Sequence, residues 1–247
     1  MNICLCIYVD RNVPISNFFH FLKTLKKTSD IFDVCIINNS GQNIYELNKY
    51  INSDKIEIIN NNINAGYTLS INQSLYYSAQ NGYDYSIVIN SSYAIVVYED
   101  WISEIFKNFD MNKGIGGYVY PIKITGDETF KKVLFSVNNN DPVEWLSKYL
   151  NKYMITNCID GNIFVINNNF ISNMKMPDPK YCNENCYGVA MSLAFMKMGI
   201  KPVNLQSIYS SSVDLYRYDI FNIIKNGTKI LYPVVIDSVR NKFAIGV

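Results

Sequence analysis

Short apolar runs alternate with segments of helical periodicity over roughly the first 90 residues. The apolar runs, which predict β-strands, are 2–9, 32–37, 56–59 and 85–89. The intervening segments with helical spacing are 14–29, 44–51 and 68–79. Strands that alternate with helices in this way fold into a mainly parallel sheet with helices on both faces. The sequence therefore predicts an α/β fold.

Small polar residues follow each predicted strand. The strand ends are Val9–Asp10, Asn38–Gly41, Asn60–Asn62 and Asn90–Ser92. Ligands of open parallel sheets bind beyond the carboxyl ends of the strands, so we expect a nucleotide at these positions. No GxGxxG segment follows the first strand, which disfavours a dinucleotide-binding domain.

The second half of the chain has a looser pattern. Its glycine-rich segment 114–117 is interpreted as a turn before a strand at 118–122. Later elements predicted from periodicity are a helix at 141–150, a strand at 163–166 entered through 160–162, a helix at 185–198, a strand at 200–205 and a C-terminal helix from Leu215 to Asn226. Without a repeat or a long linker, we expect one domain with two lobes.

The composition excludes several classes of function. The 22 Lys and Arg residues nearly balance the 21 Asp and Glu residues, so no basic surface for nucleic acid is expected. Asparagine is abundant, with 33 residues, and the single histidine, His20, excludes metal sites built on two histidines. A Ser-His-Asp triad would depend on His20 alone.

Targeting and membrane signals are also absent from the sequence. No apolar run reaches the roughly 20 residues of a membrane-spanning helix, so we expect at most peripheral membrane contact through Lys23, Lys26 and Lys27. The six cysteines predict a reduced, cytoplasmic protein. We interpret Cys182 and Cys186 as unlinked thiols, since no second pair completes a zinc site.

Two segments have the residues and spacing of a known set of motifs. Residues 64–75 (NAGYTLSINQSL) resemble the pattern N-x-G-(F/Y)-x4-N-x-G-(I/L), with Ser74 at the second glycine. Residues 84–92 (DYSIVINSS) lie where those motifs have a strand ending in N-x-D. Further matches in the same order are Asn38–Gly41, Asp100–Ile102, Gly116–Pro121 and Gly161–Ile166. Together these segments, which span roughly residues 2–205, resemble family 2 glycosyltransferases of the GT-A fold.

The resemblance implies a GT-A-like fold with a nucleotide-sugar-binding half at 1–115, an acceptor-binding half at 116–205 and a helical tail at 206–247. It implies an inverting transfer of a sugar from a nucleotide-sugar donor to a saccharide, lipid-linked or protein acceptor. The residues that it places around the nucleotide are Val9, Asp10, Asn38, Asn64, Gly66, Asn72, Asn90 and Ser92.

Three of these residues have alternative interpretations. Asn38 stands where the family has an aspartate that accepts a hydrogen bond from uracil, and an amide can also donate, which leaves the base open. Asn64 could instead form hydrogen bonds within its own loop. Asn72 could be a buried amide on the helix that forms hydrogen bonds to that loop.

The metal site departs from the family pattern. Ser92 stands where the family has an aspartate that binds Mg²⁺ or Mn²⁺, and hard divalent ions prefer anionic oxygen. No histidine follows His20 to serve as a late ligand. The resemblance thus implies Mg²⁺ or Mn²⁺ as the cofactor, whereas Ser92 predicts metal-independent chemistry and no metal-ligating residue.

Glu184 and Asp160 are the candidates for the catalytic base. An alignment on Gly199 puts Tyr187 and Gly188 where the family has an acidic pair, and Glu184 lies about three residues earlier, so it would serve as the base if the loop is longer. A carboxylate in that position could deprotonate an acceptor hydroxyl, or it could be a solvated side chain that favours the helix dipole.

Two other functions remain open at this point. One is a transferase-like domain that has lost catalysis and serves as a binding or scaffolding module, which the missing aspartate at Ser92 favours. The other is an unrelated nucleotide-binding α/β protein, for which the ordered motif matches would be coincidental.

Overall fold

The structure of the chain is a computed structural model. It describes residues 1–11, 15–26, 32–44, 51, 53, 55–91, 94–97, 101–110, 112–123, 155–205 and 213–216. The helices and strands are, in order, β1 (Ile3–Val9), α1 (Ile15–Leu25), β2 (Asp33–Asn38), β3 (Ile56–Asn60), α2 (Gly66–Gln80), β4 (Tyr85–Asn90), β5 (Ala94–Val97), α3 (Trp101–Asn108), β6 (Ile115–Lys123), β7 (Ile155–Asn167), the 3-10 helix η2 (Asn168–Asn173), α6 (Glu184–Lys197), β8 (Val203–Asn204) and β9 (Val213–Tyr216).

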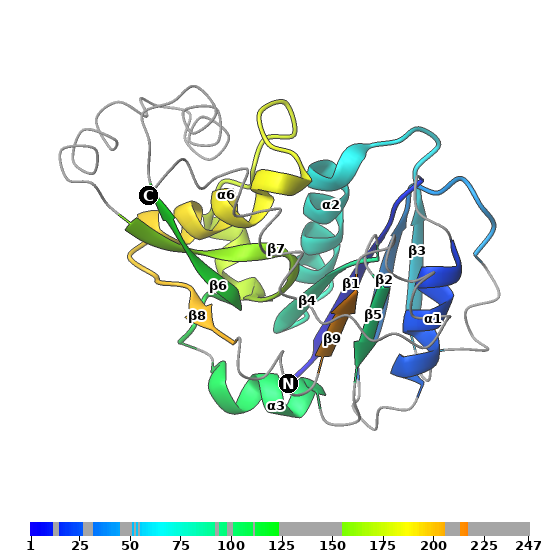
Figure 1. The fold of residues 1–247 in the computed structure, drawn as a ribbon, viewed down its shortest axis with the longest axis horizontal. Helices are drawn as coiled ribbons and strands as arrows, with labels where there is room; N and C mark the ends of the chain where they lie inside the picture. Colours follow the sequence, from blue (N-terminus) through cyan, green and yellow to red (C-terminus); the bar gives the residue numbers. More distant parts are fainter. Residues whose placement is uncertain are drawn as a thin grey trace.

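A seven-stranded sheet in the order β3-β2-β1-β4-β7-β6-β8 forms the centre of the fold (Figure 1). The strands β1 to β4 are parallel, β7 runs antiparallel to both β4 and β6, and β8 is parallel to β6. The register pairs Val9 with Asn38, Asn38 with Asn60, and Tyr8 with Asn90. The carboxyl ends of four strands therefore meet at one edge, as the predicted α/β fold requires.

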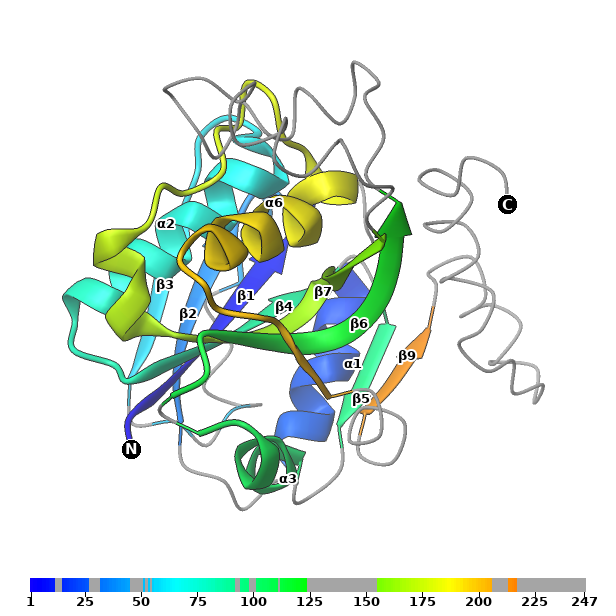
Figure 2. The ribbon, with the colours of Figure 1, turned by 90° about the vertical axis from the view of Figure 1, so that its left-hand side faces the viewer.

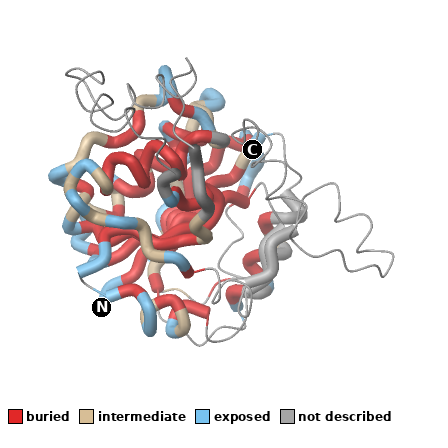
Figure 3. The backbone as a smooth tube through the Cα atoms, turned by 60° about the vertical axis from the view of Figure 1, so that its left-hand side comes forward, coloured by how far each residue is buried: buried red, intermediate tan, exposed pale blue. Residues whose placement is uncertain are grey.

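Helices cover both faces of this sheet, and each face has its own core. Alternate residues of β1 separate the two: Cys4, Cys6 and Tyr8 pack with α2 and α6, whereas Leu5 and Ile7 pack with α1 and α3. Figure 2 shows α2 and α6 on one side of the sheet and α1 and α3 on the other. The buried backbone is concentrated in the central strands and the helices against them (Figure 3). Because β1 is buried on both faces, its sequence is a continuous apolar run.

The glycines before residue 118 form a strand and not the predicted turn. Gly116 and Gly117 belong to β6, and a Cβ at Gly116 would lie 2.9 Å from the Phe109 ring. At Gly117, a Cβ would lie 3.2 Å from the carbonyl oxygen of Ile163 on the neighbouring strand. Only glycine fits at these two positions, because side-chain and backbone atoms of neighbouring segments lie close to the strand. The turn predicted from sequence does not anticipate this close packing.

Strand β7 is also longer than the sequence predicts. It begins at Ile155, so residues 160–162 lie inside it and do not lead into it, while the strand predicted at 200–205 is only Val203–Asn204. Long-range pairing with β6, which shifts register between Gly117 and Val119, extends β7 toward its amino end. The boundary at 115/116 falls within β6, and β4 pairs with β7, so one continuous sheet runs through the two predicted halves.

The described part of the C-terminal tail is a strand where a helix was predicted. Val213–Tyr216 forms β9, which pairs antiparallel with β5 in a separate two-stranded sheet. The rest of the tail, the helix predicted at 141–150 and most of that predicted at 44–51 lie outside the described residues. Among the described helices, none has the length and hydropathy that crossing a membrane requires.

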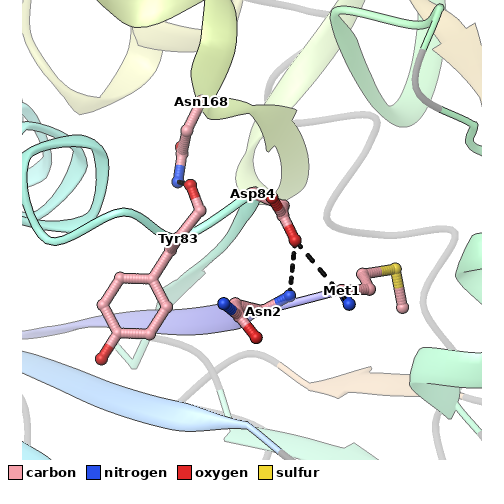
Figure 4. Close-up of polar contacts among 5 residues, drawn as sticks. All are labelled: Met1, Asn2, Tyr83, Asp84 and Asn168. Atoms are coloured by element: carbon pink, nitrogen blue, oxygen red, sulfur yellow. Dashed lines mark hydrogen bonds and ion pairs between the residues drawn. The ribbon is translucent and has the colours of Figure 1, made fainter.

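Asn168 joins several elements at the amino end of β4. Its Nδ2 donates to Ser78 Oγ at 2.8 Å and to the Tyr83 carbonyl at 2.9 Å, and its Oδ1 accepts from Ser86 Oγ at 2.7 Å. Figure 4 shows the Tyr83 contact, with the adjacent Asp84 bonded to the Asn2 amide. A buried amide with three partners fixes the end of α2, the following loop and β4 relative to η2.

The change Asn168→Ala is expected to lower the free energy of unfolding by about 2 kcal/mol, because it leaves buried hydroxyl and carbonyl groups without a partner. Urea unfolding followed by circular dichroism measures this loss. The matched control is Asn169→Ala at the exposed neighbouring position, which should cost little. Equal losses in the two variants would contradict the role of the Asn168 side chain.

Candidate functional site

Polar residues that follow β2 and β3 form a hydrogen-bonded network at the carboxyl edge of the sheet. Asn38 Nδ2 donates to Asn60 Oδ1 at 2.8 Å and to the Gln42 carbonyl at 3.0 Å. Asn38 Oδ1 accepts from both the backbone amide and the hydroxyl of Ser40. The side chain is buried, with 3% of its surface exposed. Asn38 thus fixes the loop after β2, and its carbonyl oxygen already has two protein donors.

Asn39 extends this network to α2. Its Oδ1 accepts from Asn61 Nδ2 at 2.7 Å, and its Nδ2 donates to Ser70 Oγ at 3.0 Å and to Asn64 Oδ1 at 3.4 Å. Asn61 also donates to Gln73 Oε1 at 3.1 Å. Neutral amides therefore connect the ends of β2 and β3 with the first turns of α2.

Asn64 and Gly66 form the entry to α2. Asn64 Oδ1 accepts from the Gly66 amide at 3.0 Å, so Asn64 caps a local turn, as its alternative interpretation predicts. Gly66 has a φ of 72°, and a Cβ placed there would meet nothing within 4 Å. Asn64 itself is exposed. The backbone at this entry therefore faces open space in a conformation that favours glycine.

Tyr8 lies at the end of β1 with carboxylates nearby. Desolvation raises the pKa of Tyr8 well above the ordinary tyrosine value, and the negative charges of Asp10 and Glu184 raise it further. The hydroxyl is therefore neutral, and Asp10 and Glu184, which are far apart in sequence, both act on it. The Tyr8 ring contacts the edge of Tyr67 at a centroid distance of 5.2 Å.

Asn90 and Asp160 are brought together through Asn162. Asn90 Nδ2 donates to Asn162 Oδ1 at 3.1 Å. The side-chain and backbone nitrogens of Asn162 donate to Asp160 Oδ1 at 2.7 and 3.0 Å. Asp160 is 9% exposed, and Asn90 is fully buried. One oxygen of Asp160 is thus occupied in positioning the amide that contacts Asn90.

Glu184 of α6 and Asn72 of α2 both lie near the start of α6, but they differ in burial. Glu184 is the first residue of the helix and is only partly buried. Asn72 is buried: its Oδ1 accepts from Tyr187 Oη at 2.9 Å, and its Nδ2 donates to the Pro177 carbonyl at 2.8 Å. Burial raises the pKa of Tyr187 well above its ordinary value, so this hydroxyl is a neutral donor. Asn72 therefore holds α6 and the preceding loop against α2.

Two glycines allow α6 to lie directly on β7. A Cβ at Gly188 would lie 2.6 Å from the Gly161 amide nitrogen and closer still to the Ile159 carbonyl oxygen. Ser192 Oγ donates to the Gly188 carbonyl at 2.7 Å and accepts from the Ile159 amide at 2.9 Å. Tyr67 Oη donates to the Gly161 carbonyl from α2. Close backbone contact thus places the start of α6 beside the ends of β1 and β4.

The structure brings Asp10, Asn38, Asn64, Gly66 and Asn90 to the carboxyl edge of the sheet, with Asp160 and Glu184 on its β7 side. The Val9 side chain instead packs in the core with α1, and Ser92 lies outside the described residues. Sequence analysis did not single out several residues that organise the edge, namely Tyr8, Asn39, Asn162 and Tyr187. Asn39 carried a signal as part of the polar run after β2, and Asn162 as part of the motif segment Gly161–Ile166.

The donors after β4 do not fit a hard divalent ion. Asn90 and Ser91 carry no carboxylate, and the Ser91 hydroxyl donates to the Tyr8 carbonyl at 2.6 Å. Within the described part of the chain, no group of three or more His, Cys, Asp or Glu residues could hold a metal ion. Amide and hydroxyl oxygens that already serve the protein are poor ligands for Mg²⁺ or Mn²⁺.

Comparisons of the sequence with protein-family models and with curated proteins gave no match. The fold is similar to that of the mannosyltransferase PcManGT from Pyrobaculum calidifontis in complex with GDP-Man and Mn²⁺, with a TM-score of 0.54 and 10% identity. The match covers 84% of this chain and 55% of that one. A second match, S. aureus TarS 1-349 in complex with UDP-GlcNAc, has a TM-score of 0.42 and 9% identity and covers 70% and 47% of the two chains. The chain therefore has the α/β fold of a glycosyltransferase, and it spans about half the length of the mannosyltransferase.

Proposed function

We propose that the protein is an inverting glycosyltransferase of the GT-A type that uses a nucleotide-sugar donor without a metal ion. The carrying observation is the position of the first turn of α6, which begins at Glu184. The ring of Tyr187 in this turn lies 5.5 Å from that of Tyr67, which lies 5.2 Å from Tyr8 at the end of β1. A partly exposed carboxylate thereby lies beside the carboxyl edge where parallel α/β sheets bind ligands. The likeness of the fold to a mannosyltransferase in complex with GDP-Man and Mn²⁺ supports the nucleotide-sugar donor, whereas the metal independence rests on the side chains of this chain.

The donor would bind across the ends of β1 and β2 and the entry to α2. Asp10, Asn64 and Gly66 are at least partly exposed there and would contact the nucleotide. The first backbone N–H groups of α2 have no acceptor within the helix and would face the diphosphate. The side chains of Asn38, Asn72 and Asn90 form hydrogen bonds within the protein. They would position the residues of the site and would not contact the nucleotide base.

The transfer would be a single displacement. The acceptor hydroxyl oxygen attacks the anomeric carbon, the bond from that carbon to the diphosphate oxygen breaks, and Glu184 takes the hydroxyl proton. Asp160 would position Asn162 and Asn90, because one of its oxygens accepts two bonds from Asn162. The acceptor would be a saccharide, a lipid-linked sugar or a protein, and the reaction would take place in the cytoplasm.

Calorimetric titration with nucleoside diphosphates and CMP, with and without Mn²⁺, tests this proposal. We expect one nucleotide to bind, with an affinity that Mn²⁺ leaves unchanged. Tighter binding in Mn²⁺ would overturn metal independence. The absence of binding to every nucleotide would overturn the donor assignment and favour a binding or scaffolding module.

Matched variants locate the bound nucleotide. Asn64→Ala removes the side chain that caps the turn before Gly66, and we expect about tenfold weaker binding, the equivalent of one lost hydrogen bond. Asn62→Ala changes an exposed neighbour in the same loop and should bind like the parent. Equal nucleotide affinities of the parent, Asn64→Ala and Asn62→Ala would contradict a nucleotide site at the entry to α2.

A further inference from the structure

Two free cysteines lie on either side of Glu184. Cys182 precedes α6 and Cys186 lies in its first turn, and both are largely buried. Their sulfur atoms are 3.2 Å apart. A disulfide bond has a length of about 2.05 Å, so closing the pair needs a movement of only about 1 Å.

The backbone of Cys182 is held in place, so the movement falls on Cys186 in the first turn of α6: the Cys182 amide donates to the Asp178 carbonyl at 2.9 Å, and its carbonyl accepts from Thr68 Oγ1 at 2.8 Å. Cys182 belongs to a loop, and its neighbours Tyr181 and Asn183 are exposed to solvent. A second close pair, Cys4 and Cys6, provides a contrast, with sulfur atoms 3.9 Å apart. Those two residues lie in β1, which pairs with a strand on each side, so their backbone is fixed. Only the pair at the start of α6 combines a sulfur separation of 3.2 Å with a place outside the sheet, in a loop and the first turn of a helix.

The contacts at this pair also distinguish the two sulfurs. The hydrogen-bonded contact with Cys182 lowers the pKa of Cys186, and the Asn183 amide, which donates to Cys186 Sγ at 3.1 Å, contributes in the same direction. The same contact raises the pKa of Cys182. The positive end of the α6 dipole favours a thiolate at Cys186 as well. Cys186 is therefore the nucleophile, and Cys182 is the second thiol.

We propose that Cys182 and Cys186 form a reversible disulfide by exchange with a small-molecule disulfide, and that closure of this disulfide displaces Glu184. The Cys186 thiolate attacks one sulfur of the small disulfide and releases one thiolate. Cys182 then attacks the Cys186 sulfur of the mixed disulfide and releases the second thiolate. The two protons of the cysteine thiols pass to the released thiolates, so the protein loses two electrons and the small disulfide gains them.

Closure would act on the start of α6 through its existing contacts. The Cys182 carbonyl accepts from Thr68 Oγ1 of α2 at 2.8 Å, which anchors one side of the pair. Movement of Cys186 toward that anchor distorts the first turn of the helix, in which Glu184 lies. As a consequence that rests on the proposed function, the oxidised protein would bind nucleotide and lose transfer.

Incubation of the folded full chain with reduced and oxidised glutathione at varied ratios tests the pair. We expect two of the six thiols to disappear, with a loss of mass equal to two hydrogen atoms and a Cys182–Cys186 bond in the peptide map. Dithiothreitol should restore both thiols. Cys182→Ser should trap a glutathione adduct on Cys186, whereas Cys158→Ser, at a buried thiol on β7, should oxidise like the parent.

Two results would overturn the disulfide: six thiols that survive excess oxidised glutathione, or equal loss of Cys4, Cys6 and Cys158. Hydrogen exchange of the peptide that covers 182–187 gives a readout without activity, and we expect faster exchange after oxidation. Unchanged exchange would overturn the displacement of Glu184. A protein that forms the disulfide but binds no nucleotide would overturn only the proposed function.

Discussion

Gly188→Ala is expected to lower the free energy of unfolding by about 3 kcal/mol, at the upper end of the usual cost of overpacking. The added methyl group would lie 2.6 Å from the Gly161 nitrogen and 2.9 Å from the Asp160 carbonyl carbon. These are backbone atoms of β7 at the register shift in its pairing with β6, where Tyr67 Oη donates to the Gly161 carbonyl and holds the strand in place. The helix must therefore move away from the sheet. Alanine improves helix propensity by only about 1 kcal/mol, which does not offset this clash.

The same change would disturb the candidate site. Movement of α6 away from β7 breaks the hydrogen bond between Tyr187 and Asn72 and shifts Glu184. Urea unfolding measures the loss of stability, and Gly199→Ala is the control. Gly199 has a φ of 79° with nothing within 4 Å of an added Cβ, so that change costs about 1 kcal/mol of backbone strain alone. If Gly188→Ala costs no more than Gly199→Ala, the close contact between α6 and β7 does not limit stability.

The order of the first strands and helices follows from sequence because it depends on local patterns. A strand buried on both faces is a continuous apolar run, as in Ile3–Val9, and a helix has a period near 3.6 residues, as in Gly66–Gln80. The extent of β7 and the strand at Val213–Tyr216 depend on pairing with distant segments. Strand pairing between distant segments cannot be predicted from the local sequence pattern.

Glycine shows a second reason for the differences. Gly66 and Gly199 have positive φ, which a turn or the end of a helix requires and which sequence reasoning anticipates. Gly116, Gly161 and Gly188 serve another purpose, because backbone or ring atoms lie where their Cβ would be. The same residue type therefore marks either a backbone angle or a close contact, and only the assembled fold distinguishes the two.

For the candidate site, sequence reasoning predicted which polar strand ends lie together but not which hydrogen bonds their side chains form. The polar strand ends do meet at one edge, because parallel strands place their carboxyl ends together. Asn72 is a buried helix amide, as its alternative interpretation predicts, but its partners are Tyr187 and the Pro177 carbonyl and not the loop at 64–66. Such partners, like the bond from Asn38 to Asn60, come from other elements and could not be read from the motifs. Whether an amide binds a ligand or its own protein depends on these non-local neighbours.

Glu184→Gln is expected to lower the rate of sugar transfer by about a hundredfold or more, the usual contribution of a positioned general base. Glutamine keeps the size of the side chain and the position of α6 but cannot accept the acceptor proton. The assay uses the sugar nucleotide that corresponds to the nucleotide found by calorimetry. Nucleotide affinity should stay at the parent value, because the carboxylate acts on the acceptor.

The matched control is Glu57→Gln, which removes an exposed carboxylate on β3 and should transfer at the parent rate. Asp160→Asn separates the two candidate bases: its loss should disturb the Asn162 contact with Asn90, and with it nucleotide binding as well as rate. Nuclear magnetic resonance of the product tests inversion at the anomeric carbon. Unchanged transfer in Glu184→Gln, with a large loss in Asp160→Asn at full nucleotide affinity, would reassign the base to Asp160. That result would leave Glu184 as a helix-terminal charge, stabilised by the dipole of α6.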